Sequence, residues 1–188
     1  MTPSSVFLVL LHICSLHLIA VAMPTCQLEG NMVQSAHHLL RDLGGPFPAR
    51  CLPYNANISF PGSAFPAAKA NSLQCPRVLW VVDESLEEAG IMFEERELPV
   101  AWDNQKVNKF KHLQQRLEEA GSCLPSVDDS GVLSSYFSNV TAVLDQQDSA
   151  GCGWMALKRD LVRILEAALH KHRACFSWRP IQHQNHTH

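Results

Sequence analysis

Apolar side chains recur every three or four positions in five stretches of the chain, and no stretch shows a sustained alternation of apolar and polar residues. The first spacing is typical of amphipathic α-helices, whereas the second would indicate half-buried strands. The helices are expected at about residues 28–43, 77–96, 104–120, 131–146 and 152–178. The sequence therefore predicts an all-α protein.

A long connection separates the first two predicted helices. It runs from Gly44 to Pro76 and contains six prolines, which exclude a continuous helix. Helices joined by a few residues run antiparallel, but a connection of this length can cross the full height of a bundle. The second helix can then run parallel to the first. We expect the four longest helices to form an up-up-down-down bundle with a long first crossover loop, and the helix at 131–146 to be an additional short one.

The chain opens with an uncharged apolar run from Val6 to Ala22 that only serine and histidine interrupt. This pattern is typical of a secretory signal peptide, which we assign to residues 1–22. No later stretch approaches the ~20 apolar residues that a membrane-spanning helix needs. We expect a secreted monomer without membrane insertion, with one helical domain at 23–179 and a His-rich tail at 180–188.

The net charge and the histidine content bear on whether the protein binds nucleic acid or metal ions. A formal charge of −3 at pH 7 argues against generic phosphate binding, so nucleic acid is not an expected partner. Histidines in the tail (His183, His186 and His188) and the pair His37 and His38 raise the question of a metal. A zinc site needs three or four converging ligands, and we expect no metal and no other cofactor.

Two features fit passage through the secretory route. Three N-x-[ST] sequons are candidate glycosylation sites, at Asn57, Asn139 and Asn185. Six of the seven cysteines follow the leader, and an even number in an exported chain indicates disulfides.

The expected topology divides these six cysteines between the two ends of the bundle. Cys51 and Cys152 lie at one end. The other end holds Cys26, Cys75, Cys123 and Cys175. Because a disulfide needs Cα atoms within about 7 Å, the first two must pair with each other and the remaining four among themselves. Three connectivities stay open at this point.

The head of the last predicted helix resembles a known family. Cys152-Gly153-Trp154, followed by Leu157, Lys158 and Leu161, is similar to the C-A-W signature of the type I interferons. Further similar pieces occur in family order: Cys51 with Phe60-Pro61 and Phe65-Pro66, then Ala101-Trp102-Asp103, Gln115 to Cys123, and Tyr136-Phe137. The resemblance spans nearly the whole mature chain. Gly153 and the short segment between Cys123 and Cys152 are similar to a fish-type, cysteine-rich branch.

The resemblance implies a fold and a set of bridges. The family fold is a helical cytokine bundle of the topology expected above. Its usual disulfides correspond to Cys26 with Cys123 and Cys51 with Cys152, which leaves Cys75 to pair with Cys175. That third bridge departs from the four-cysteine family pattern, so two free thiols are the alternative.

The resemblance also implies a function: binding to a two-chain class II cytokine receptor, followed by JAK-STAT signalling for antiviral defence. In the family one receptor chain contacts the first loop and the outward face of the last helix, and the other meets the opposite face. The corresponding exposed positions are Leu52, Asn55, Lys158, Arg159, Val162, Arg163 and Glu166. Many relatives have an arginine where this chain has Asn55, so the contact there is weaker or is rebuilt with Arg50.

Other interpretations compete with this one. Lys158, Arg159 and Arg163 could form an ordinary solvated helix face. The chain could be another helical cytokine, such as an interleukin-10-like factor, or a helical carrier of lipid or metal. An enzyme is not expected, because the cysteine of Gly151-Cys152-Gly153-Trp154 has a disulfide partner and no motif supplies a histidine or asparagine beside it. Trp102 and Trp154 are interpreted as packing residues.

Overall fold

The computed structural model describes residues 26–179 except 57, 68–70 and 128–130. The expected signal peptide, the tail and the sequons Asn57 and Asn185 lie outside the described residues. The helices of the described part are α2 (Gly30–Arg41), η1 (Ala49–Ala56), η2 (Gly62–Ala64), α3 (Cys75–Glu95), α4 (Asn104–Gly121), α5 (Val132–Leu144), α6 (Ala150–Lys171) and η3 (Arg173–Cys175), where η marks a 3-10 helix. No strand occurs in these residues beyond one isolated bridge between Glu29 and Ser177, and the all-α prediction is confirmed.

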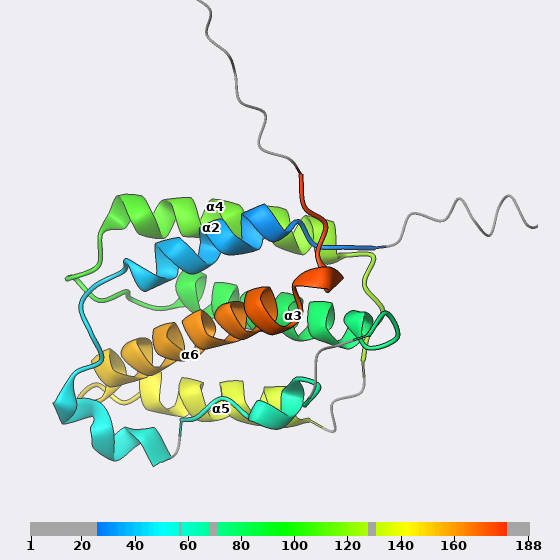
Figure 1. Cartoon of the computed structure of the whole chain (residues 1–188). Coiled ribbons are helices and arrows are strands. Elements are labelled where there is room, and N and C mark those ends of the chain that lie inside the picture. The colour runs from blue at the N-terminus through cyan, green and yellow to red at the C-terminus, as the bar shows by residue number, and fades with distance from the viewer. Residues whose placement is uncertain (1–25, 57, 68–70, 128–130, 180–188) are drawn as a thin grey trace, which may run out of the picture.

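The helices form a bundle in which α6 contacts α2, α3 and α5. Figure 1 shows α2 and α3 running in one direction and α4 and α6 in the other, with the shorter α5 beside α6. The predicted up-up-down-down bundle with one additional short helix is therefore confirmed. The long connection passes along α6 and carries η1 and η2.

The expected end of the last helix was wrong. The apolar spacing predicted a helix to about Trp178, but α6 ends at Lys171 and the chain turns through η3. The turn lets Ser177 lie beside the start of α2, where its N–H donates to Leu28 O at 3.0 Å and Gly30 N–H donates to Ser177 O at 2.8 Å. Tertiary hydrogen bonds thus replace the last helical turns.

An aromatic cluster fills the end of the core next to the start of α6. The rings of Phe93, Trp102 and Trp154 lie 5.2–5.7 Å apart, and Phe110 contacts Phe93 at 5.2 Å. Trp102 and Trp154 are 4% and 2% exposed, which agrees with their interpretation as packing residues. The indole N–H of Trp154 donates to Glu97 O at 2.9 Å, so its one polar group is satisfied.

Three disulfides form in the expected pairs, one at one end of the bundle and two at the other. The pairs are Cys26–Cys123, Cys51–Cys152 and Cys75–Cys175, with Cα–Cα distances of 5.8, 5.2 and 5.1 Å. Each closes a loop of 97 to 101 residues. In the chain-entropy model one such loop closure stabilises the fold by about 4–5 kcal/mol. The alternative of two free thiols does not apply to this structure.

Candidate functional site

The outward face of α6 is organised around a buried carboxylate. Asp160 is 1% exposed and accepts hydrogen bonds from the Tyr136 hydroxyl at 3.0 Å and from the backbone N–H of Phe60 at 3.2 Å. It thereby joins α6 to α5 and to the long loop. Burial, followed by the negative charge of Asp160, raises the pKa of Tyr136, so the hydroxyl keeps its proton and remains a donor.

Arg159 extends this network to the loop. Its Nε donates to Asp160 Oδ1 at 2.7 Å, its Nη2 donates to Ile58 O at 2.9 Å, and its guanidinium lies 4.9 Å from the centre of the Phe47 ring. The arginine fork suits such simultaneous contacts with a carboxylate, a carbonyl and an aromatic face. Only 14% of the side chain is exposed.

Lys158 makes a second connection to the same loop. Its ammonium donates to Gly45 O at 3.0 Å, and the residue is 8% exposed. Burial lowers the pKa of Lys158, and the charge of Asp42 partly opposes this effect. The expectation that Lys158 and Arg159 are exposed was therefore wrong, because the loop folds over the helix face on which they lie. We call Lys158, Arg159 and Asp160 the loop clamp.

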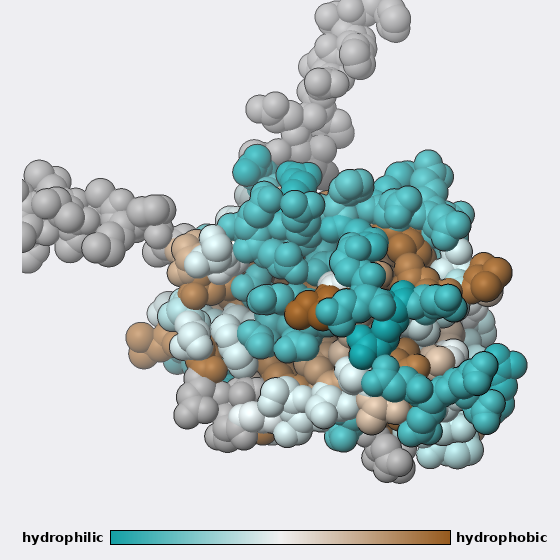
Figure 2. Space-filling model, turned by 180° about the vertical axis from the view of Figure 1, so that it is seen from behind, coloured by the Kyte–Doolittle hydropathy of each residue, from teal (hydrophilic) through white to brown (hydrophobic). Residues whose placement is uncertain are grey.

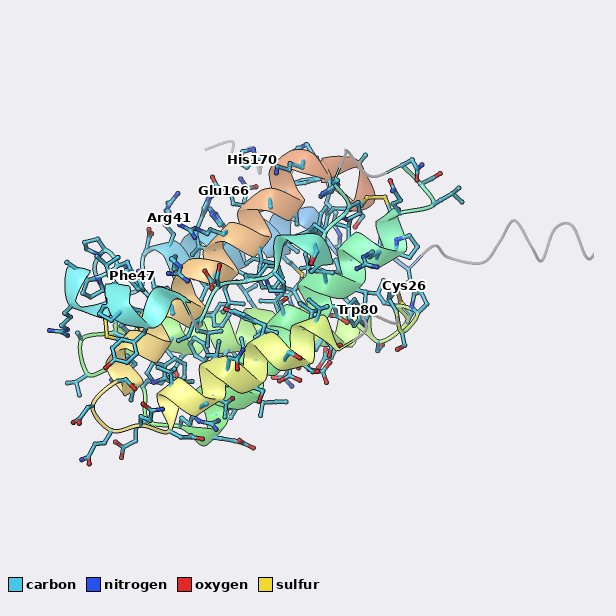
Figure 3. The ribbon with its side chains drawn as sticks, turned by 90° about the horizontal axis from the view of Figure 1, so that it is seen from below. Cys26, Arg41, Phe47, Trp80, Glu166 and His170 are labelled. Carbon is cyan, nitrogen blue, oxygen red and sulfur yellow. A yellow bond between two sulfur atoms is a disulfide. The ribbon has the colours of Figure 1, made fainter. Side chains whose placement is uncertain are left out.

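The other predicted positions remain accessible. Arg163 and Glu166 are exposed on the next turns of α6, and Val162 is half-buried beside them. These residues, with Arg41, Phe47, Lys158 and Arg159, line a shallow groove of about 310 Å³. Figure 3 shows Phe47, Arg41 and Glu166 in a row along this side of the molecule.

Leu52 and Asn55 belong to the loop but not to this groove. Leu52 is 57% exposed on η1, which the Cys51–Cys152 disulfide joins to the start of α6. Arg50 is exposed on the same short helix. The side chain of Asn55 lies outside the described part of the structure, so its role stays a prediction.

The opposite side of the molecule, formed by α3, α4 and α5, is different in character. Figure 2 shows hydrophilic residues over much of this side, with small hydrophobic groups between them. A groove of about 570 Å³ runs between α3 and α4, with the ion pair Lys111–Glu94 at 2.7 Å on its rim. Its floor is Gly90, where an added Cβ would overlap the Gln114 side chain. Gly90 therefore weakens α3 but allows α4 to pack closely.

One carboxyl group on α3 is less exposed than the helical pattern indicates. Asp83 Oδ1 is buried and has no hydrogen-bond partner among the described residues, and it lies against Gly121 of α4. Burial, followed by the charges of Glu87, Glu118 and Glu84, raises the pKa of Asp83 to about 7.

The sequence pattern did not identify Asp160, Tyr136 and Phe47 as partners of the predicted face. The available signal was an aspartate directly after two basic residues on an otherwise apolar side of the last helix. No described group of three or more His, Cys, Asp or Glu side chains is arranged to hold a metal ion. Within the same described residues, no helix is both long and apolar enough to span a membrane.

Comparisons with known proteins place the chain in a family. A family model described as the interferon alpha/beta domain matches residues 26–171. Human interferon alpha-6 is 22% identical over 130 residues, covering 63% of this chain and 67% of the relative, and pig interferon alpha-1 is 23% identical over 187 residues, covering 89% and 94%. The solved structure of zebrafish interferon 2 is similar with a TM-score of 0.64 and 27% identity, over 77% of this chain and 99% of the other. The chain belongs to the interferon alpha/beta family, and its family and its helical bundle are those of a type I interferon-like cytokine.

Proposed function

We propose that the protein is a secreted, monomeric ligand that joins two chains of a class II cytokine receptor and so starts JAK-STAT signalling for antiviral defence. The family match supports binding to cell-surface cytokine receptors. The observation that carries the assignment of a contact face is the accessible part of α6, where Arg163 and Glu166 are exposed beside a loop that the helix itself holds in place.

One receptor chain contacts Val162, Arg163 and Glu166 together with Leu52 of the loop. These residues combine apolar contact area with two charged groups of opposite sign, a composition that suits a protein interface with a limited number of strong contacts. Lys158 and Arg159 act on this interface indirectly, because they position the loop. The second receptor chain binds the opposite side of the bundle, near α3 and α4.

A glycan on Asn139 is compatible with this arrangement. Asn139 is exposed on α5, and its serine neighbours Ser135 and Ser138 share the exposed surface of that helix. A glycan there would cover α5 and leave the α6 groove open. Enzymatic removal of N-glycans followed by mass spectrometry of the α5 peptide tests whether Asn139 is modified.

The test compares refolded wild-type protein with an Arg163→Ala, Glu166→Ala variant on fish cells, measuring STAT phosphorylation and protection against virus. Because hot-spot residues contribute about 2 kcal/mol or more each, we expect the variant to need at least tenfold more protein. The matched control is Arg179→Ala, Glu29→Ala, which removes an ion pair, 3.4 Å apart, between the exposed Arg179 and the half-buried Glu29 next to the start of α2.

Each outcome has a distinct meaning. Loss of activity in the α6 variant alone supports both the ligand and the face. Equal activity in all three proteins keeps the signalling function and rejects the face. Silence of all three on receptor-bearing cells, with circular dichroism showing intact helices, rejects the signalling function.

A further inference from the structure

A second groove lies between α2 and α6, next to the proposed receptor face but nearer to the end that holds Cys26. Its volume is about 300 Å³, and its lining includes three histidines, His37, His38 and His170. Arg41 of α2 and Arg173 of η3 also line it. Figure 3 shows Arg41, Glu166 and His170 directed to the same side of the molecule. We call this feature the histidine groove.

The spacing of its side chains follows from two antiparallel helices. Along α2, Arg41 follows His37 by four residues and His38 by three, so both histidines neighbour it on the helix surface. Along α6, Glu166 and His170 are four residues apart, and Arg173 follows on η3. The groove is therefore lined by imidazole and guanidinium nitrogens from both helices, with Glu166 among them. At a rise of 1.5 Å per residue, the side from Glu166 to Arg173 is roughly 10 Å long.

The arginines are held without a full set of acidic partners. The Arg173 guanidinium lies 3.7 Å from the centre of the Trp178 ring, and the indole N–H of Trp178 donates to Arg173 O at 3.0 Å. Among the described residues, no carboxylate forms a salt bridge with Arg173. Within the described part of the chain, Arg41 pairs only with the exposed Asp42, at 3.3 Å, and Glu166 is the single acidic residue that lines the groove.

The ionisation of His37 responds first to burial and then to the charges around it. Its pKa is lowered by burial, then by His38 and Arg41; Glu166 opposes the effect and His170 adds to it. Since histidine is the side chain whose charge ordinarily changes between pH 5 and 8, acidification adds positive charge to a groove that already contains two arginines. An anion in the groove would favour the charged imidazoles.

We propose that the histidine groove binds sulfated polysaccharide chains of the cell surface, and that acidification strengthens this binding. An extended polyanion fits better than a single small anion, because the cationic groups come from both helices and do not converge on one point. The charge excess of the groove is local, since the whole chain has a formal charge of −3. This inference does not depend on the receptor proposal, because binding to polysaccharide is measured without a receptor.

The experiment is salt elution of the mature full chain from immobilised heparin at pH 7.5 and pH 6.0, with dissociation constants from biolayer interferometry. We expect wild type to elute at higher salt at pH 6.0. The Arg41→Gln, Arg173→Gln variant should bind about tenfold more weakly, from the loss of two cations near a polyanion. The matched control, Lys109→Gln, Arg116→Gln, removes two exposed cations from α4 and should bind within about twofold of wild type.

A second variant separates the histidines from the arginines. His38→Gln, His170→Gln should bind like wild type at pH 7.5 and show a smaller gain at pH 6.0, because only His37 remains. In nuclear magnetic resonance titrations, a heparin oligosaccharide should raise the pKa of His37 in wild type. This site-specific readout does not require the arginine variant to fold.

Several results would overturn the proposal. They are equal elution of wild type at both pH values, an equal loss of binding in the α4 control, or an unchanged His37 titration when the oligosaccharide is bound. Binding to desulfated heparin or to phosphatidylserine vesicles as tight as binding to heparin would also overturn it, since it would show a general attraction to anionic surfaces.

Discussion

The two halves of α6 carry similar charged side chains but use them differently. In the first half, Lys158 and Arg159 are covered by the loop and bind its carbonyl groups. In the second half, Arg163 and Glu166 remain exposed. A basic residue on the polar side of a helix can thus bind a neighbouring segment or face solvent. The outcome depends on whether a segment of the chain packs over that residue. The proposed receptor face therefore depends on the first half for its shape and on the second half for its contacts.

The largest loss in the free energy of unfolding is expected for Asp160→Ala. This change leaves the guanidinium of Arg159, the hydroxyl of Tyr136 and the N–H of Phe60 without their shared acceptor in a buried place. Breaking a buried charge pair in this way costs about 3–5 kcal/mol. Urea denaturation should show this loss, while Glu166→Ala on the exposed half serves as control and should change the free energy of unfolding by less than about 0.5 kcal/mol.

Arg159→Ala should lower the free energy of unfolding by about 2 kcal/mol. This loss is smaller than that of Asp160→Ala because Asp160 keeps Tyr136 and Phe60 as donors. The loop should also loosen where Arg159 bound Ile58 O. Faster hydrogen exchange of the Phe60 amide, with unchanged exchange in α4, would be the signature. If Arg159→Ala left the exchange of Phe60 unchanged, the clamp would not hold the loop.

The comparison between covered and exposed charged side chains extends to α3, where the carboxyl group of Asp83 is partly buried. Its pKa in the folded state is about 7, above the ordinary value of 3.8, so the folded protein binds this proton more tightly than the unfolded chain does. The unfolding free energy should therefore fall as the pH rises from about 4 to about 7. With allowance for solvent screening of this half-buried group, the loss is on the order of 1–2 kcal/mol.

Asp83→Asn should remove this pH dependence and make the protein more stable than wild type at pH 7.5. Thermal unfolding at pH 5.0 and pH 7.5 measures both effects. Glu94→Gln is the matched control, since Glu94 is exposed on the same helix. Parallel pH profiles of wild type and Asp83→Asn would contradict the assignment.

The smallest change in stability is expected for Arg163→Ala with Glu166→Ala. Both side chains are exposed and form no salt bridge with a described residue, so the free energy of unfolding should stay within about 0.5 kcal/mol of wild type. Signalling by the same variant should fall, as described above. Lost stability combined with full signalling would reverse the roles assigned to the two halves of α6.

Much of the fold could be predicted from local patterns. The apolar spacing located each α-helix to within a few residues, apart from the end of the last one. The long proline-rich connection favoured a parallel second helix, and the positions of Cys51 and Cys152 were consistent with that topology. These predictions succeeded because helix periodicity, proline and chain length act locally or through simple geometry.

The candidate site was less predictable. The sequence alone, through its helical pattern, its six mature cysteines and its Cys152-Gly153-Trp154 segment, determined the helix bundle, the order of its elements and the family. Only the tertiary structure decided that Lys158 and Arg159 are clamps, that Arg163 and Glu166 are accessible, and that His37, His38 and His170 share one groove. The physical reason is that exposure and pKa depend on which distant segments pack against a residue, and helical periodicity identifies a face without showing what covers it.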